Sequence, residues 1–194
     1  VEMSDGRVLC TIADVCGKGL QAALVTFSIH TMIRALADYG RDLTEIIERL
    51  NSHLSEYLPD DSFVTMLCVA IDPRTGVMEY VNCGHLPPYL FGPLGNSRRL
   101  SASDNPPLGI APSRFSSRQD RLAKSEILFI YTDGLTELCN GARQMLGEEE
   151  LSGIDTKPLV GHLAAWNYFQ SVSAPVNDAF IKTWKTYIKN PKRV

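Results

Sequence analysis

Two continuous apolar runs, far apart in the chain, each lead into an aspartate. The first run extends from Val8 to Ala13 and precedes Asp14, and the second extends from Ile127 to Thr132 and precedes Asp133 and Gly134. A lone Asp-Gly pair is most simply a turn. Two acids that each follow a buried strand also suit a hard cation, which prefers oxygen ligands. The pattern leaves both interpretations open: two separate turns, or one shared metal site.

The loop Gly17-Lys18-Gly19 leads into a segment with helical spacing. Apolar residues recur every three or four positions as far as Leu36, and Gly40 supplies a stop. A second helix is expected from Asp42, with Glu45 three residues later as a capping box. We expect both apolar stripes to face a core, the first formed by Leu20, Ala23, Leu24, Phe27, Met32, Ile33 and Leu36, the second by Leu43, Ile46, Ile47, Leu50 and Leu54.

The middle of the chain has the pattern of antiparallel strands. Phe63 to Ile71 is apolar on both faces, as in a central strand, and a turn at Asp72 to Gly76 leads to a partner strand at Val77 to Cys83. The following segments are expected to be a short strand at Tyr89 to Phe91, an exposed loop from Gly92 to Asn105, and a polar stretch between Arg114 and Lys124.

This order of elements favours an α+β fold in which helices cover β-sheets, and argues against a doubly wound parallel sheet. The glycine loop lacks the length of a phosphate-binding Walker loop, and no GxSxG nucleophile turn occurs in the sequence. His85 follows Asn82, Cys83 and Gly84 near a turn, where a hydrogen-bonded structural histidine is favoured over a catalytic base.

Composition adds an expectation about the cellular setting. The 194 residues, 44% hydrophobic and 21% charged, fit a globular chain with a core. We find no run long enough to span a membrane, no signal peptide and no basic stripe, so neither a membrane nor a nucleic acid is expected as a partner. Five cysteines without a CxxC pair indicate small buried residues in a reducing, cytoplasmic compartment. The chain reaches a strand by Val8, which suggests a fragment.

Charge divides the sequence into two parts. From Gly153 onward six lysines and arginines face two aspartates, a balance of +4, so the preceding part carries −7 of the net charge of −3. This shift indicates two segments of different origin.

Four separated motifs carry a resemblance to a known family. IADVCGKGLQAAL, FVTMLCVAIDPRTGVMEYVNCGHLPPYL, PPLGI and LFIYTDGLTEL occur in the order and at roughly the spacing found in bacterial metal-dependent serine/threonine phosphatases of the PPM type. The resemblance covers residues 1 to about 151. It is strongest to the branch that contains sporulation and stress-response regulators.

The resemblance implies an αββα sandwich with two Mn²⁺ or Mg²⁺ ions at one edge. It also implies hydrolysis of phosphoserine or phosphothreonine by a metal-activated water, without a side-chain nucleophile. The expected partner is a phosphorylated regulatory protein such as an anti-sigma-factor antagonist.

Carried over to this sequence, the resemblance makes Asp14 the carboxylate that bridges the two metals. The backbone carbonyl of Val15 is then a further ligand, and Asp133 binds the second metal. No catalytic side chain is assigned. The residues expected to shape the site, without transferring protons, are Gly17, Gly19, Gly84, His85 and Gly134.

Two parts of the family pattern do not occur in the sequence. The family has a Gly-Gly-Asp-like segment ahead of the first strand and an Asp-Asp-x-Thr strand near its end, each with a metal-binding aspartate. We therefore expect a phosphatase domain truncated at both ends. The alternative function is a catalytically inactive remnant or scaffold, because Asp14 and Asp133 alone offset little of the charge of two cations.

The last part of the chain, residues 152–194, resembles something different. From Gly153 onward the sequence is similar to an internal piece of the periplasmic substrate-binding proteins of urea and short-chain amide transporters. We expect this tail to be foreign to the phosphatase domain.

Overall fold

The computed structural model of this chain describes residues 1–38, 42–92, 96–102 and 105–137. The elements are β1 (Val8–Val15), α1 (Leu20–Ala37), α2 (Leu43–Tyr57), β2 (Val64–Ile71), β3 (Val77–Cys83), β4 (Tyr89–Phe91), β5 (Ser97–Arg99), β6 (Arg118–Arg121), β7 (Ile127–Phe129) and α3 (Asp133–Thr136). Helices and antiparallel strands coexist, which confirms the α+β prediction.

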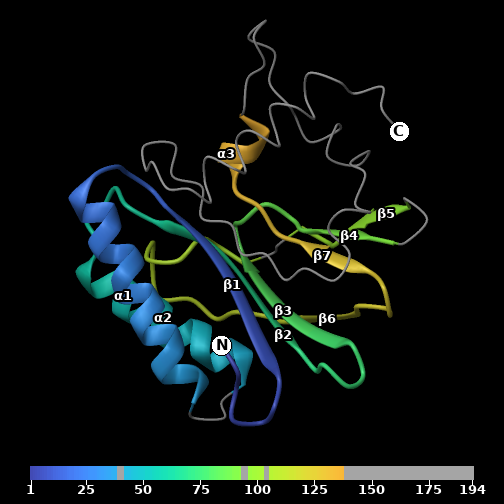
Figure 1. The fold of residues 1–194 in the computed structure, drawn as a ribbon. Helices are drawn as coiled ribbons and strands as arrows, with labels where there is room; N and C mark the ends of the chain where they lie inside the picture. The colour runs from blue at the N-terminus through green and yellow to red at the C-terminus, as the bar shows by residue number, and fades with distance from the viewer. Residues whose placement is uncertain (39–41, 93–95, 103–104, 138–194) are drawn as a thin grey trace, which may run out of the picture.

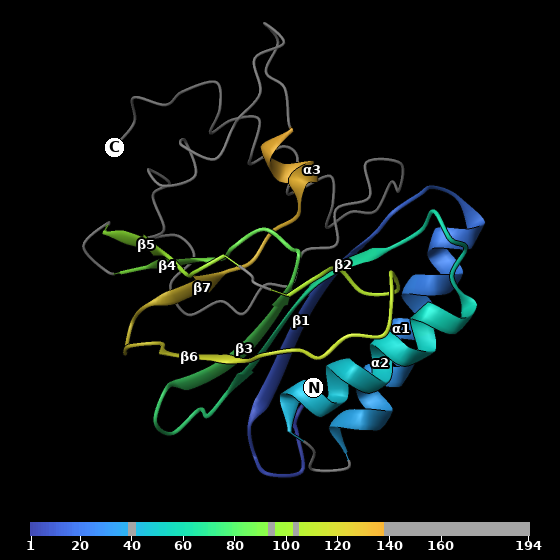
Figure 2. The same ribbon diagram turned by 180° about the vertical axis from the view of Figure 1, so that it is seen from behind.

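Three layers make up the described part of the molecule (Figures 1 and 2). The first sheet has the strand order β1-β2-β3-β6, and the second has the order β5-β4-β7. Helices α1 and α2 contact β1 and β3 and so cover one face of the first sheet. This is the helix–sheet–sheet part of the expected αββα sandwich. The described ranges contain no helix pair on the outer face of the second sheet, and that layer stays a prediction.

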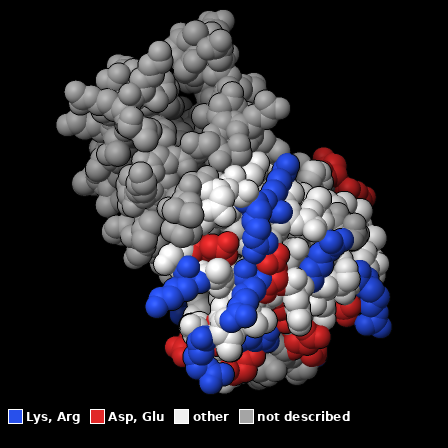
Figure 3. Space-filling model, turned by 90° about the vertical axis from the view of Figure 1, so that its right-hand side faces the viewer, with Lys and Arg blue, Asp and Glu red and all other residues white. Residues whose placement is uncertain are grey.

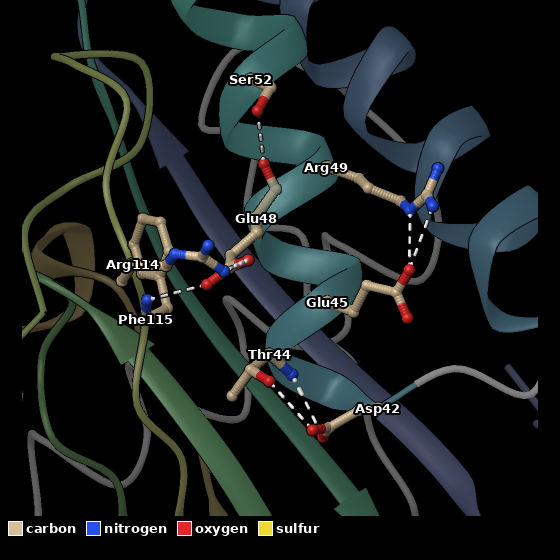
Figure 4. A network of polar contacts seen from close by, with 8 residues as sticks. All are labelled: Asp42, Thr44, Glu45, Glu48, Arg49, Ser52, Arg114 and Phe115. Atoms are coloured by element: carbon tan, nitrogen blue, oxygen red, sulfur yellow. Dashed lines mark hydrogen bonds and ion pairs between the residues drawn. The ribbon is translucent and has the colours of Figure 1, made fainter.

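Helix α2 is positioned by its apolar face, as its spacing predicts. The five residues of the expected stripe are all buried, with exposed fractions of 0 to 3%. Asp42 caps the first turn by accepting from the Thr44 amide and hydroxyl, whereas Glu45 pairs with Arg49 (Figure 4). On the polar side, Glu48 accepts from Arg114 and from the Phe115 amide, which fastens the loop before β6 to the helix.

The first half of α1 departs from the expected core-facing stripe. Leu20, Leu24 and Phe27 are 78, 60 and 70% exposed. The core shared by the first sheet and α2 is reached instead by the buried Ile29 and Ile33, with Val25 partly buried against it. The prediction was wrong for Leu20, Leu24 and Phe27 because, at the period of an α-helix, these three residues lie on the side of α1 opposite to the buried Ile29 and Ile33.

The same helix changes one expectation about membranes. Of the described helices, α1 is long and apolar enough to cross a bilayer by length and composition, with a mean hydropathy of 1.3. This corrects the expectation that no apolar run has that length. Core helices of soluble proteins meet the same criterion, so the finding by itself assigns no membrane role.

Two strands occur where the sequence predicts loops. β5 lies within the expected loop from Gly92 to Asn105, and β6 lies within the polar stretch after Arg114. Both are edge strands with largely exposed polar side chains, so they lack the apolar alternation that marks a half-buried strand. Arg98 of β5 binds the Asp120 carboxylate of β6 at 2.8 and 2.9 Å. Basic and acidic side chains are interspersed on this side of the molecule (Figure 3).

The cysteines only partly match their predicted role as buried residues. Cys68 and Cys83 are buried, but Cys10 is half-buried and Cys16 is exposed; all four are free thiols. The expectation fails at Cys16 because this residue follows β1 in the exposed loop that leads to α1. Cys139 lies outside the described residues.

The domain division also falls outside the described residues. The boundary near 151 and the tail at 152–194 are in the part of the chain that the structure does not describe. Both stay predictions.

Candidate metal centre

The strand alternation of β1 directs Asp14 toward the second sheet. Leu9, Ala13 and Val15 pack with the helices, whereas Ile12 packs in the core between the two sheets. Because side chains alternate across a strand, Asp14 belongs to the same row as Ile12. It comes at the end of that row, where the apolar filling between the sheets stops and the side chain becomes exposed.

Asp133 approaches from the second sheet. β7 ends at Phe129, and Asp133 is the first residue of the short helix α3, after Thr132 in an extended conformation. Figures 1 and 2 show α3 at the end of the molecule at which β1 leads into α1. The side chain of Asp133 is exposed.

The two aspartates lie close enough to affect one another electrostatically. Partial burial raises the pKa of Asp14, and the negative charge of Asp133 raises it further, while a hydrogen bond from the Val15 amide lowers it. A nearby like charge disfavours the ionised form of Asp14. The structure therefore places these distant acids within electrostatic range of one another. That they share a metal centre stays a prediction.

The turn from Asn82 to His85 is closed by the asparagine side chain. Its Oδ1 accepts from the His85 amide at 2.8 Å, and its Nδ2 donates to the His85 carbonyl at 2.9 Å. Gly84 within the turn has a φ of +67°, in the left-handed region that favours glycine. A Cβ on Gly84 would also lie 2.8 Å from Cγ of Pro107. These contacts explain why asparagine and glycine stand at their positions in this turn.

Replacement of Gly84 by alanine is expected to destabilise the fold. The left-handed conformation alone costs about 1–3 kcal/mol for a residue with a side chain, and the contact with Pro107 adds to it. Urea denaturation measures the loss. Gly6→Ala is the matched control, because Gly6 has a φ of +83° but no atom within 4 Å of an added Cβ. Equal losses in the two variants would show that the contact with Pro107 is unimportant.

His85 is buried, and both of its ring nitrogens are engaged. Nδ1 lies 2.8 Å from the Thr65 hydroxyl and Nε2 lies 3.0 Å from the Tyr131 carbonyl. Burial lowers the pKa of His85, although the Tyr131 hydrogen bond and the Asp133 charge oppose this. A neutral ring with two occupied nitrogens supports the expected shaping role over proton transfer.

The other glycines predicted to shape the site have less distinct roles. Gly17 and Gly19 have φ values of +112° and +80°, and nothing lies within 4 Å of a Cβ added to either. Their conformation requires glycine, while the space around them is open. Gly134 has no positive φ, and an added Cβ would make only ordinary contact with Thr132. The structure gives no steric reason for glycine at position 134.

Two contributors were not anticipated from the sequence. Thr65 of β2 pairs directly with Asp14 of β1, and its hydroxyl contacts His85. The backbone carbonyl of Tyr131 holds the other side of the ring. Thr65 had a signal, because it is the one polar residue in an otherwise apolar strand. The role of the Tyr131 backbone carbonyl gives no signal in the sequence.

The donor set suits a hard cation but is small. Asp14 and Asp133 supply carboxylate oxygens, and the Val15 carbonyl is a third candidate. In the described ranges, no group of three or more His, Cys, Asp or Glu residues could hold a metal ion. The described residues therefore fit a divalent metal by chemistry, with only two anionic ligands.

Comparisons with known proteins show the family of this chain. A family model described as stage II sporulation protein E (SpoIIE) matches residues 4–167. The phosphoserine phosphatase RsbP of Bacillus subtilis is 28% identical over 141 residues, which cover 70% of this chain and 35% of RsbP. The chain thus spans about a third of the length of this curated relative.

Solved structures show the same fold. The RsbU and RsbW domains of a Mycobacterium tuberculosis protein match with a TM-score of 0.65 and 26% identity, covering 75% of this chain and 40% of that one. RsbX in complex with magnesium matches with a TM-score of 0.56 and 23% identity, covering 66% of this chain and 61% of that one.

Proposed function

Because the chain belongs to the stage II sporulation protein E (SpoIIE) family, we propose that it hydrolyses phosphoserine or phosphothreonine on a regulatory protein with the help of divalent metal ions. One observation carries this proposal. Asp14, near the end of β1 in the first sheet, and Asp133, just after β7 of the second sheet, are far apart in sequence but close enough for the charge of Asp133 to raise the pKa of Asp14.

The metal is proposed to be Mn²⁺ or Mg²⁺, held by the carboxylates of Asp14 and Asp133 and by the Val15 carbonyl. Partial burial raises the pKa of Asp14 and the nearby charge of Asp133 raises it further, so the ionised carboxylate of Asp14 is disfavoured where no cation offsets its charge. When bound, such ions activate water and neutralise charge on a phosphoryl group. Support for a metal comes from the oxygen-only donor set and from a magnesium-containing structural relative.

The remaining residues hold the edge in shape. The Asn82–His85 turn joins the two sheets beside the carboxylates, through bonds of His85 to Thr65 and Tyr131. The loop from Gly17 to Gly19 follows Asp14 closely in sequence and is exposed, which suits contact with a large substrate such as a protein. Asp14 and Asp133 are the residues proposed to act on the reaction; His85 and the glycines shape the site.

The substrate is proposed to be a phosphorylated regulator such as an anti-sigma-factor antagonist, in the cytoplasm. RsbP is named a phosphoserine phosphatase, and a structural relative carries an RsbW domain beside an RsbU domain. Both names support a phosphoprotein substrate within a regulatory system.

A second candidate function is a catalytically inactive remnant or scaffold. It is favoured by the small number of anionic ligands, because two carboxylates offset only half the charge of two divalent cations. The two candidates share the fold and differ in whether phosphate is released.

Phosphate release from a phosphoserine peptide and from a chromogenic phosphoester separates the two. We expect turnover by the 194-residue chain with manganese and none with EDTA, because EDTA removes the metal that Asp14 and Asp133 are proposed to bind. Manganese binding seen by calorimetry without turnover would support the inactive remnant. Turnover that persists in EDTA would contradict both.

A further inference from the structure

The ring of His85 connects two parts of the molecule through bonds of fixed direction. Nε2 lies 3.0 Å from the Tyr131 carbonyl, which can only accept, so Nε2 carries the proton. Nδ1 is then unprotonated and accepts from the Thr65 hydroxyl at 2.8 Å. His85 is 6% exposed, so water competes little for either bond.

The two partners of the ring belong to different sheets and stand beside the two aspartates. Thr65 is in β2 of the first sheet, directly opposite Asp14 in the register of β1 and β2. Tyr131 follows β7 of the second sheet and comes two residues before Asp133. The ring thus spans the gap between the sheets at the edge where the carboxylates face one another.

The backbone of His85 is held in place as well as its ring. Asn82 binds both the amide and the carbonyl of His85, and Asn82 itself is buried at the end of β3. The side chain is therefore held at its backbone and at both nitrogens. Such a link fixes the distance between Thr65, which pairs with Asp14, and the segment that leads from Tyr131 to Asp133.

We propose that His85 is a positioning residue: by bridging Thr65 and the Tyr131 carbonyl, it sets the separation of Asp14 and Asp133 across the two sheets. In this arrangement Thr65 shares the role, since its hydroxyl forms one of the two bonds. The inference rests on the proposed function, in which the two carboxylates hold divalent metal. Partners that orient metal ligands from behind typically change metal affinity by about 10- to 100-fold.

A pair of substitutions at Thr65 tests this role. Thr65→Val removes the hydroxyl at nearly constant shape, and Thr65→Ser keeps it. Manganese titration calorimetry of the 194-residue chain should show a dissociation constant raised about 10-fold in Thr65→Val and nearly unchanged in Thr65→Ser. His85→Gln, which removes the ring, should weaken manganese binding at least as much. Melting in EDTA establishes that each variant is folded before it is titrated.

A metal-free measurement separates this inference from the proposed function. A double-mutant cycle with Asp14→Asn and Asp133→Asn, followed by melting in EDTA, reports how strongly the carboxylates repel one another. We expect this coupling to fall in the Thr65→Val background and to persist in the Thr65→Ser background.

Each outcome decides one of the two questions. If the wild type binds manganese and Thr65→Val binds it equally well, the positioning role is overturned while the proposed function stands. If the wild type binds no manganese, the proposed metal-dependent function is wrong, and the double-mutant cycle alone tests the positioning role of His85. A coupling that is the same in all three backgrounds overturns the positioning role whether or not metal binds.

Discussion

Replacing Asp133 with asparagine removes manganese-dependent phosphate release, with a fall in turnover of at least about 100-fold. The reason is electrostatic. Asp133 is one of only two acidic side chains that meet at this edge of the described structure, and asparagine keeps its size while removing its charge. The measurement is phosphate release from a phosphoserine peptide at saturating manganese. Asp14→Asn is expected to act in the same way.

Asp38→Asn is the matched control for this experiment. Asp38 is an exposed carboxylate at the opposite end of α1 from the loop that follows Asp14, so its loss should leave turnover unchanged. Full activity in Asp133→Asn would place the reaction elsewhere and remove the main support for the proposed function. A loss that also appears in Asp38→Asn would indicate a general effect of charge.

The same substitution at Asp14 is expected to stabilise the metal-free protein at neutral pH. Its folded-state pKa is raised, so the folded state binds the proton more tightly than the unfolded state does. Its contribution to stability therefore falls as pH rises from the ordinary value of 3.8 to the raised value, and stays low above it. Melting in EDTA at neutral pH should show a higher midpoint in Asp14→Asn. A lower midpoint would mean that the carboxylate makes favourable contacts that outweigh its repulsion.

Replacing Leu50 with alanine lowers the free energy of unfolding by about 2–5 kcal/mol. Leu50 is fully buried between α2 and the first sheet, so its truncation loses apolar burial and leaves a cavity. Urea denaturation measures the loss. Since α2 also carries the contacts to the loop before β6, we expect that loop to become more accessible to protease.

Leu24→Ala is the matched control for Leu50. It makes the same chemical change in a helix, but Leu24 is 60% exposed on α1, so the change should stay within about 0.5 kcal/mol. A loss at Leu24 as large as that at Leu50 would show that the first half of α1 is covered in solution.

The contrast between the two helices shows where the sequence is informative. The α2 stripe is flanked by charged residues, so its apolar side is unambiguous and proves to be the buried side. The sequence of α1 is apolar over most of its surface, and periodicity could not indicate that Leu20, Leu24 and Phe27 stay exposed. Strands β5 and β6 were missed for a related reason: edge strands with polar side chains on both faces leave no periodic signal.

The sequence by itself determined the family, the α+β class and the importance of Asp14 and Asp133, because these depend on local order: an apolar strand, an acid and then glycine. Only the tertiary structure decided that the two acids meet, because their approach depends on strand register and on the packing of one sheet over another. It also decided the role of His85, whose partners are a hydroxyl on β2 and a carbonyl beyond β7. Contacts between residues so distant along the chain arise from packing, and no local pattern encodes them.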